Sequence, residues 1–172
     1  MAGTWSDIYG DTSRDWSTDG GGDVICPAGT FISRFSTCHG AVMDCIAVNC
    51  SDGTVIAPRG GATGSWSAEC GGFSKVQTRS VPFPWSCLGG IIVFCNSTPS
   101  DNLMGSNDGS LSEYNCPAGM LLTGLRVTMG NPIVNGYVYT QFYNVKNIRY
   151  LCDTVSGGRD AGIHLHCFHA CS

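Results

Sequence analysis

The sequence predicts an all-β protein built from three cysteine-bracketed units. Apolar residues occur in short blocks between clusters of Gly, Asn, Asp, Ser and Pro, a pattern typical of a β-sandwich, barrel or prism. Helix signals are almost absent. A Cys-x-x-Gly sequence or a close relative opens each unit, and an isoleucine four residues before a cysteine closes it. A repeat of this period indicates a repeat architecture.

The apolar blocks mark the expected strands, and the third unit contains an additional hairpin. The strands are expected over residues 30–35, 45–48, 90–94, 120–127, 147–151 and 162–166. The dipeptide Asn135-Gly136 is a strong signal for a two-residue hairpin turn, because both residues of such a turn need a positive φ. This hairpin would place Tyr137 and Tyr139 on one face, with Tyr143 close behind.

The cysteine brackets predict three disulfides that staple three sheets. The expected pairs are Cys26 with Cys50, Cys70 with Cys95, and Cys116 with Cys152. Each bond would join an early strand to a late strand of its own unit and would stabilise the fold by about 3 kcal/mol. We expect one domain over residues 1–172. Its repeat units would lie at about 20–64, 65–110 and 111–152, with residues 1–19 and 153–172 completing the sheets.

Five of the eleven cysteines lie outside these brackets. Cys38 with Cys45 would close a turn, whereas Cys167 has two possible partners, Cys171 and Cys87. An odd count leaves one thiol, which would stay reduced or would link two chains into a covalent dimer. Because disulfides form and persist in oxidising compartments, the cysteine content predicts an extracellular, secreted protein.

Composition excludes several classes of partner. The formal net charge is −4 and the chain contains two lysines, which argues against a nucleic-acid ligand because such ligands need clustered positive charge. No segment approaches the roughly 20 apolar residues of a membrane-spanning helix, so we expect no membrane insertion. Charged residues make up 13% of the chain, and the hydroxyl and amide side chains in their place are common on secreted β proteins.

Two segments carry a resemblance to a known family. The segment Leu88-Gly-Gly-Ile-Ile-Val-Phe-Cys95 and residues 43–56 resemble the repeat of the vitelline membrane outer layer protein. In that repeat, an apolar strand ends in Cys and is followed by an acidic residue and Gly, and then by Gly-x-Trp and a further Cys. Here the last two are Trp66 and Cys70. The resemblance covers roughly residues 20–152. It implies a three-fold β-prism of three short antiparallel sheets, a fold that jacalin-type lectins share.

A second, shorter resemblance concerns a sugar-binding loop. The sequence Gly40-Ala-Val-Met-Asp44 is similar to the Gly-x-x-x-Asp sugar loop of jacalin-type lectins. A loop carboxylate accepts two hydrogen bonds from sugar hydroxyls, while backbone N–H groups donate to ring oxygens. Because Cys38 and Cys45 flank the loop, the alternative is that Asp44 belongs to a rigid structural turn.

The aromatic hairpin is the other candidate for sugar binding. Tyr137, Tyr139 and Tyr143 offer apolar ring faces for stacking on a sugar and hydroxyls for its polar rim. The alternative is that the hairpin packs onto its own sheet. With Gly40 and Asp44, these tyrosines form the predicted carbohydrate site.

The expected function is therefore that of a secreted, lectin-like protein that binds glycans or glycoproteins. The first alternative is a structural component of an extracellular coat or matrix. The second is a carbohydrate-active enzyme using Glu69 or Glu113 with an aspartate, since glycoside hydrolysis needs two carboxylates across a cleft. Glu69 and Glu113 occupy similar repeat positions and could also face a central space together. His164 and His166 would share a face of a strand, as a pair of zinc ligands does, but a solvent-facing strand with a disulfide is the expected structure there. We expect no metal and no cofactor.

Overall fold

The computed structural model describes residues 3–10, 12, 16–39, 42–60, 66–81, 87–95, 97–99, 104–105, 109–138 and 144–155. Within these residues all regular secondary structure is β-strand, so the all-β prediction is confirmed. The described part of the chain contains no helix long and apolar enough to span a membrane. The strands are β1 (Thr4–Trp5), β2 (Tyr9–Gly10), β3 (Trp16–Ile25), β4 (Ile32–His39), β5 (Met43–Cys50), β6 (Val55–Gly60), β7 (Trp66–Glu69), β8 (Phe73–Val81), β9 (Cys87–Cys95), β10 (Thr98–Pro99), β11 (Met104–Gly105), β12 (Ser110–Asn115), β13 (Leu121–Val134), β14 (Tyr137–Val138) and β15 (Asn144–Asp153).

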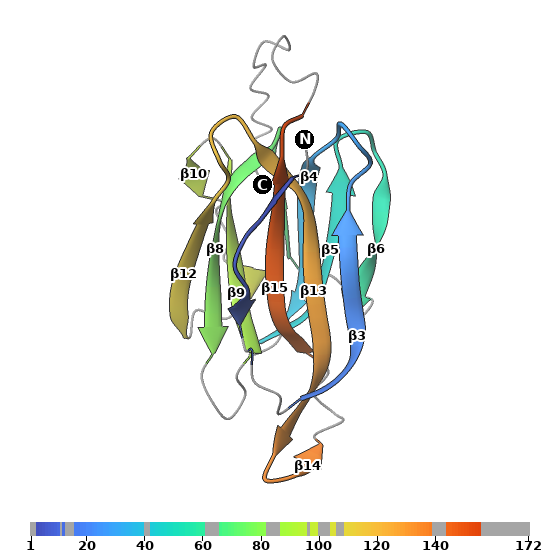
Figure 1. The fold of residues 1–172 in the computed structure, drawn as a ribbon, viewed down its shortest axis with the longest axis vertical. Helices are drawn as coiled ribbons and strands as arrows, with labels where there is room; N and C mark the ends of the chain where they lie inside the picture. Colours follow the sequence, from blue (N-terminus) through green and yellow to red (C-terminus); the bar gives the residue numbers. More distant parts are fainter. Residues whose placement is uncertain are drawn as a thin grey trace, which may run out of the picture.

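The strands form three antiparallel sheets whose strands run along the long axis of the molecule (Figure 1). Sheet 1 has the order β1-β15-β13-β14, with β2 also paired to β15 and β3 also paired to β13. Sheet 2 has the order β6-β5-β4-β7, and sheet 3 has the order β10-β9-β8-β12 with β11 paired to β9. Sheet 1 therefore combines the beginning of the described chain with its end. The expected strand at 162–166 lies outside the described residues.

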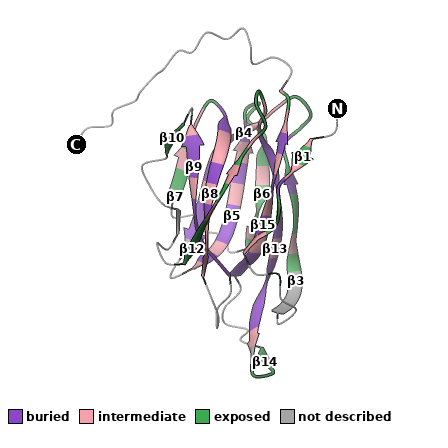
Figure 2. Cartoon of the chain, turned by 60° about the vertical axis from the view of Figure 1, so that its left-hand side comes forward, coloured by how far each residue is buried: buried purple, intermediate pink, exposed green. Residues whose placement is uncertain are grey.

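The core lies between the three sheets and follows from the two-residue period of a strand. In β5, for example, buried residues alternate with half-buried ones from Met43 to Cys50, apart from the buried pair Cys45 and Ile46. Phe35 of sheet 2 packs edge-on against Phe73 of sheet 3, with ring centroids 5.2 Å apart. Figure 2 shows buried residues along the central strands and exposed residues on β12, β14 and the edges. Apolar burial is the main force that holds the sheets together.

The unit-opening motif forms the turn by which the chain passes from one sheet to the next. Residues 27–30 connect β3 of sheet 1 to β4 of sheet 2, and the Thr30 N–H donates to the Pro27 carbonyl at 3.0 Å. Gly29 has a φ of 82°, which the third residue of a type II turn requires and which glycine adopts without steric cost. Residues 117–120 repeat the same turn between sheets 3 and 1.

The three bracket disulfides are present, but each joins two different sheets. Cys26 follows β3 of sheet 1 and is bonded to Cys50 at the end of β5 in sheet 2. Similarly, Cys70–Cys95 joins sheet 2 to sheet 3, and Cys116–Cys152 joins sheet 3 to sheet 1. Each bond thus lies within one predicted unit, but a unit does not coincide with one sheet, because each opening cysteine follows the last strand of the preceding sheet. The three bonds form a closed ring at one end of the prism, which we call the stapled end.

The stapled end is built three times from the same local interactions. Near the start of each central strand, the second residue of β4 and β8 and the third residue of β13 lie at a β-bulge, where the pairing register shifts by one. This residue carries a hydroxyl in all three sheets, and its carbonyl accepts the N–H of an opening cysteine at 2.8–2.9 Å. The three pairs are Ser33 with Cys70, Ser74 with Cys116, and Thr123 with Cys26. Positions in the three sheets can therefore be compared by counting from the bulge.

Candidate functional site

The predicted carbohydrate site belongs to the end of the prism opposite the stapled end, which we call the loop end. Strands β4, β8 and β13 start near the disulfide ring and run away from it, and β5, β9 and β15 run back to it. The connections β4–β5, β8–β9 and β13–β15 therefore belong to the loop end. In Figure 1, β3 and β5 point toward one end of the molecule, and the β14 hairpin projects from the other.

Asp44 is a strand residue rather than a loop residue. It is the second residue of β5, where it is half-buried between the fully buried side chains of Met43 and Cys45. Cys38 and Cys45 are paired in register and form a disulfide with a Cα–Cα distance of 5.0 Å. The pairing of His39 with Met43 extends the ladder past Asp44, which therefore lies within the strand, at a register shift between the two pairs. Gly40 lies outside the described residues.

The expected hairpin at Asn135-Gly136 is confirmed. Both residues have positive φ, 51° and 80°, as a type I′ turn requires. Val134 pairs with Tyr137 across the turn, and the Tyr137 side chain is 75% exposed. Within the described part of the chain, Tyr137 therefore does not pack onto its own sheet. Tyr139 and Tyr143 lie outside the described residues.

Asp44 and the hairpin share the loop end. Gly60 pairs with Cys45, next to Asp44. Gly60 also lies close to Met129, because a Cβ atom added at Gly60 would be 2.9 Å from the Met129 Cε. Met129 belongs to β13, and the same strand continues to the hairpin at Tyr137. Sheet 2 thus contributes the carboxylate and sheet 1 the aromatic ring, with the hairpin projecting beyond the body of the prism (Figure 1).

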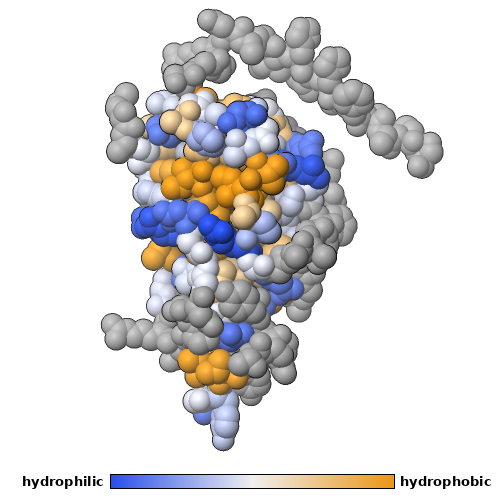
Figure 3. All heavy atoms as spheres, turned by 90° about the vertical axis from the view of Figure 1, so that its right-hand side faces the viewer, coloured by the Kyte–Doolittle hydropathy of each residue, from blue (hydrophilic) through white to orange (hydrophobic). Residues whose placement is uncertain are grey.

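Exposed apolar side chains are found at the hairpin and on the outer surface. Tyr137 and Val138 of β14 are 75% and 45% exposed. Ile25 at the end of β3 and Val55 at the start of β6 are 43% and 69% exposed. Figure 3 shows an apolar patch on the face that carries β3 and β6, and a second one on the projecting hairpin. The hairpin patch is the one that adjoins the predicted site.

The two glutamates that an enzyme would need do not face a common space. Glu69 lies at the end of the edge strand β7 in sheet 2, where its Oε1 is 2.9 Å from the Arg34 Nη1. Glu113 lies on the edge strand β12 in sheet 3, where its Oε2 is 2.8 Å from the Lys75 Nζ. Both side chains are solvent-exposed and belong to different sheets, so the paired arrangement required for glycoside hydrolysis is not formed.

The hydrogen bonds around Glu113 stabilise its ionised carboxylate and lower its pKa. The ammonium group of Lys75 makes the largest contribution, followed by the amides of Gln77 and Asn115, and together they lower the pKa of Glu113 to about 2. Gln77 Nε2 donates at 2.9 Å and Asn115 Nδ2 at 3.0 Å. A carboxyl with this pKa is ionised at neutral pH and cannot serve as a general acid there.

The remaining candidate residues are partly outside the described part of the chain. Among the described residues, no group of His, Cys, Asp and Glu is placed to hold a metal ion. His164, His166, Cys167 and Cys171 lie beyond the described residues. Cys87 is 0% exposed and does not belong to any of the four disulfides that the described residues form.

One feature was not predicted from the sequence. A pocket of about 440 Å³ opens on sheet 2 near the stapled end, and Arg34, Asn49, Ser51 and Glu69 are among the residues that line it. These residues come from three strands and a turn and are brought together only by strand pairing. No sequence motif links them, so the sequence carries no signal for this pocket.

Comparison with known proteins identifies the fold. No family model and no curated protein matches the sequence. Among solved structures, the second β-prism domain of RbmC from V. cholerae is similar, with a TM-score of 0.53 and 16% identity over 88% of this chain and 99% of that one. This chain is a β-prism. The expected similarity to the vitelline membrane outer layer protein stays a prediction.

Two further solved structures are similar over about nine tenths of this chain. A mannose-specific jacalin-related lectin from Morus nigra, solved with mannose, has a TM-score of 0.59 and 12% identity, covering 89% of this chain and 96% of that one. The V. cholerae biofilm matrix protein Bap1 has a TM-score of 0.60 and 18% identity over 90% of this chain. The match covers only 24% of the Bap1 chain, so this chain corresponds to about a quarter of that protein. At these identities the similarity establishes the fold.

Proposed function

We propose that the protein is an extracellular carbohydrate-binding β-prism whose glycan site lies at the loop end. The observation that carries the proposal is that Asp44 of sheet 2 and the exposed ring of Tyr137 in sheet 1 belong to the same end of the prism. Four disulfides support an oxidising, extracellular compartment. The similar lectin from Morus nigra, which binds mannose, supports a glycan as the ligand.

The two groups suit a sugar for different reasons. The Asp44 carboxylate accepts hydrogen bonds from adjacent hydroxyls, and bonds to a charged acceptor are stronger than neutral ones. The Tyr137 ring offers an apolar face to the C–H groups of a pyranose. Gly40, Tyr139 and Tyr143 complete the proposed site. The test is a glycan array probed with the folded, oxidised protein, on which we expect a defined set of glycans to bind. An array without any bound glycan would overturn the proposal.

A second candidate is a structural component of an extracellular matrix, favoured by the similarity to the biofilm matrix protein Bap1. The predicted covalent dimer would support this function. Because Cys87 is 0% exposed, such a cross-link falls on Cys167 or Cys171. On a non-reducing gel we expect a dimer that Cys167→Ser or Cys171→Ser abolishes and Cys87→Ser does not. A purely monomeric protein under oxidising conditions would contradict this alternative.

A further inference from the structure

Sheet 2 carries a row of three polar residues next to its bulge. Arg34, the residue after the bulge at Ser33, pairs with Asn49 on one side and with Glu69 on the other. The row forms one wall of the pocket of about 440 Å³, and the turn at Ser51 helps to form another. The pocket is a shallow depression open to solvent, and its volume lies within the range of about 300–1,000 Å³ that is common for ligand pockets.

The corresponding rows in the other two sheets are different. In sheet 3, Lys75 pairs with Phe94, whose ring is 8% exposed and lies 4.5 Å from the Lys75 Nζ. This ring occupies the position that Asn49 holds in sheet 2. In sheet 1, Gly124 pairs with Ile25 and Leu151, and these two side chains line a smaller pocket of about 250 Å³. The same scaffold position is thus polar and open in sheet 2, filled in sheet 3 and apolar in sheet 1.

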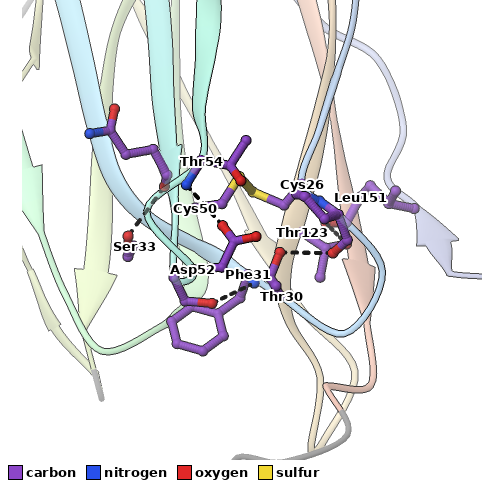
Figure 4. The surroundings of a disulfide bond; sticks show 12 residues. Cys26, Thr30, Phe31, Ser33, Cys50, Asp52, Thr54, Thr123 and Leu151 are labelled. Atoms are coloured by element: carbon purple, nitrogen blue, oxygen red, sulfur yellow. Dashed lines mark hydrogen bonds between the residues drawn. A yellow bond between two sulfur atoms is a disulfide. The ribbon is translucent and has the colours of Figure 1, made fainter.

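The lining of the pocket in sheet 2 is held by disulfides and backbone hydrogen bonds. Cys50 and Cys70 line it, and each is fixed to a neighbouring sheet by a disulfide. Ser51 N–H donates to the Phe31 carbonyl at 2.8 Å, and Gly53 N–H donates to the Cys50 carbonyl at 2.9 Å. Figure 4 shows this turn around the Cys26–Cys50 disulfide. A site held in place before binding loses less entropy when the ligand binds.

Only some of the polar groups in this row form hydrogen bonds within the described part of the protein. Arg34 donates to Glu69 Oε1 at 2.9 Å and to Ser67 Oγ at 3.2 Å. Within the described part of the chain, neither the Asn49 amide nor the Oε2 of Glu69 has a hydrogen-bond partner, and the Glu69 side chain is 67% exposed. The row therefore offers a carboxylate acceptor beside an amide that both donates and accepts. Because the positive charge of Arg34 is balanced by the negative charge of Glu69, the row favours an uncharged ligand.

We propose that this pocket is a second glycan subsite, which binds one neutral sugar ring through adjacent hydroxyls. Glu69 accepts from one hydroxyl, and the Asn49 amide donates to a neighbouring one. The inference rests on the proposed function only in taking the ligand to be a glycan. The subsite lies near the stapled end and shares no residue with the site at Asp44 and Tyr137.

The test is an NMR titration of the isotope-labelled, oxidised full chain with D-glucose, D-galactose, D-mannose and N-acetylglucosamine at millimolar concentrations. We expect at least one sugar to shift the backbone amides of Ser51 and Gly53 and the side-chain amide of Asn49 in a saturable way. Asn49→Phe copies the filled arrangement of sheet 3 and should abolish these shifts. Glu69→Gln should weaken binding about tenfold, the value of one hydrogen bond of about 1.4 kcal/mol.

The matched control is Glu113→Gln, because Glu113 is also an exposed, ion-paired carboxylate but lies on sheet 3. It should leave the affinity unchanged. The proposal is overturned if no sugar of the panel shifts the three groups, or if neither Asn49→Phe nor Glu69→Gln alters the shifts. Should Asn49→Phe fail to fold, Glu69→Gln decides alone. If the sugars shift the NMR signals of the pocket but no glycan on the array binds, the loop-end site is refuted and the pocket subsite is supported. If glycans on the array bind but the NMR signals of the pocket do not shift, the pocket subsite is refuted and the loop-end site is supported.

Discussion

The Tyr150 hydroxyl lies 2.6 Å from the Thr78 Oγ1, and this hydrogen bond connects β15 of sheet 1 to β8 of sheet 3 inside the core. Tyr150 is 0% exposed and Thr78 is 1% exposed. The Tyr150 ring is also 5.7 Å from the ring of Tyr9 and 6.1 Å from that of Tyr114, measured between centroids. Two sheets are thus joined by a polar contact within an aromatic cluster.

Tyr150→Phe should lower the free energy of unfolding by about 1–3 kcal/mol, because it leaves the buried Thr78 hydroxyl without its partner. Urea denaturation of the oxidised protein measures this change. Tyr137→Phe serves as the control, since its ring is 75% exposed and the loss should stay within about 0.5 kcal/mol. Equal effects of the two substitutions would show that the inter-sheet bond does not contribute to stability.

The stability of the protein should fall at alkaline pH. Burial raises the pKa of Tyr150 well above its usual value of about 10, and the hydrogen bond to Thr78 offsets only part of this increase. Above about pH 10 the unfolded chain loses this proton while the folded protein keeps it, so the stabilising contribution present below that pH is progressively lost. Denaturation midpoints measured across this range should decrease more for the wild type than for Tyr150→Phe. Parallel curves would contradict the assignment.

At acid pH a smaller loss should come from Glu113. Its pKa is lowered from 4.5 to about 2, so its contribution to stability is present above the unfolded pKa and disappears as the pH falls toward about 2. Because the carboxylate is exposed, salt should screen the effect. We expect Glu113→Gln to flatten the acid limb of the stability curve slightly at low ionic strength. If the variant and the wild type respond to acid identically, the Lys75 interaction is not stabilising.

Removing each disulfide should destabilise the protein by an amount that follows loop length. Replacing both cysteines of Cys116–Cys152, which closes the longest loop with a separation of 36, should cost about 2–5 kcal/mol. The Cys38–Cys45 bond, with a separation of 7, should contribute about 1.5 kcal/mol less. Chemical denaturation of paired Cys→Ser variants gives the order. A larger cost for Cys38–Cys45 would mean that the chain-entropy account fails here.

Binding at the loop end should depend on both of its described residues. Asp44→Asn and Tyr137→Ala should each weaken the best array ligand about tenfold or more, because one removes a charged acceptor and the other a stacking face. Isothermal titration calorimetry with that ligand measures the change. Asp7→Asn and Leu111→Ala are the matched controls, as both residues are exposed and lie elsewhere. Wild-type affinity in both loop-end variants would place the site elsewhere.

Local signals in the sequence were sufficient for much of the fold. The turn at Asn135-Gly136 could be predicted because its geometry depends on the two residues themselves, and the strands around Ile46 and Ile91 follow from apolar blocks. The pairs of bracket cysteines were also predicted. That each bond crosses from one sheet to the next was not, because the sheet to which Cys26 or Cys70 belongs depends on pairing with distant strands.

The candidate sites could likewise be predicted only in part, because they too depend on pairing between distant strands. The sequence predicts Asp44 in a loop, whereas the pairing of His39 with Met43 extends the ladder past it. The row of Glu69, Arg34 and Asn49 depends on two strand pairings and on a bulge at Ser33 that shifts the register by one residue. A register shift cannot be read from composition or periodicity, so these three residues could not have been grouped in advance.

The closed ring of disulfides also determines which parts of the chain can be cut without separating the molecule. Three loop-end connections, β4–β5, β8–β9 and β13–β15, each fall between the two cysteines of one inter-sheet bond. A protease that cleaves any of these connections would therefore leave both fragments covalently attached. For the same reason, these connections can vary in length and sequence while the cross-linked framework keeps the three sheets together. The architecture thus separates a disulfide-linked frame from three segments that can be cut without releasing a fragment.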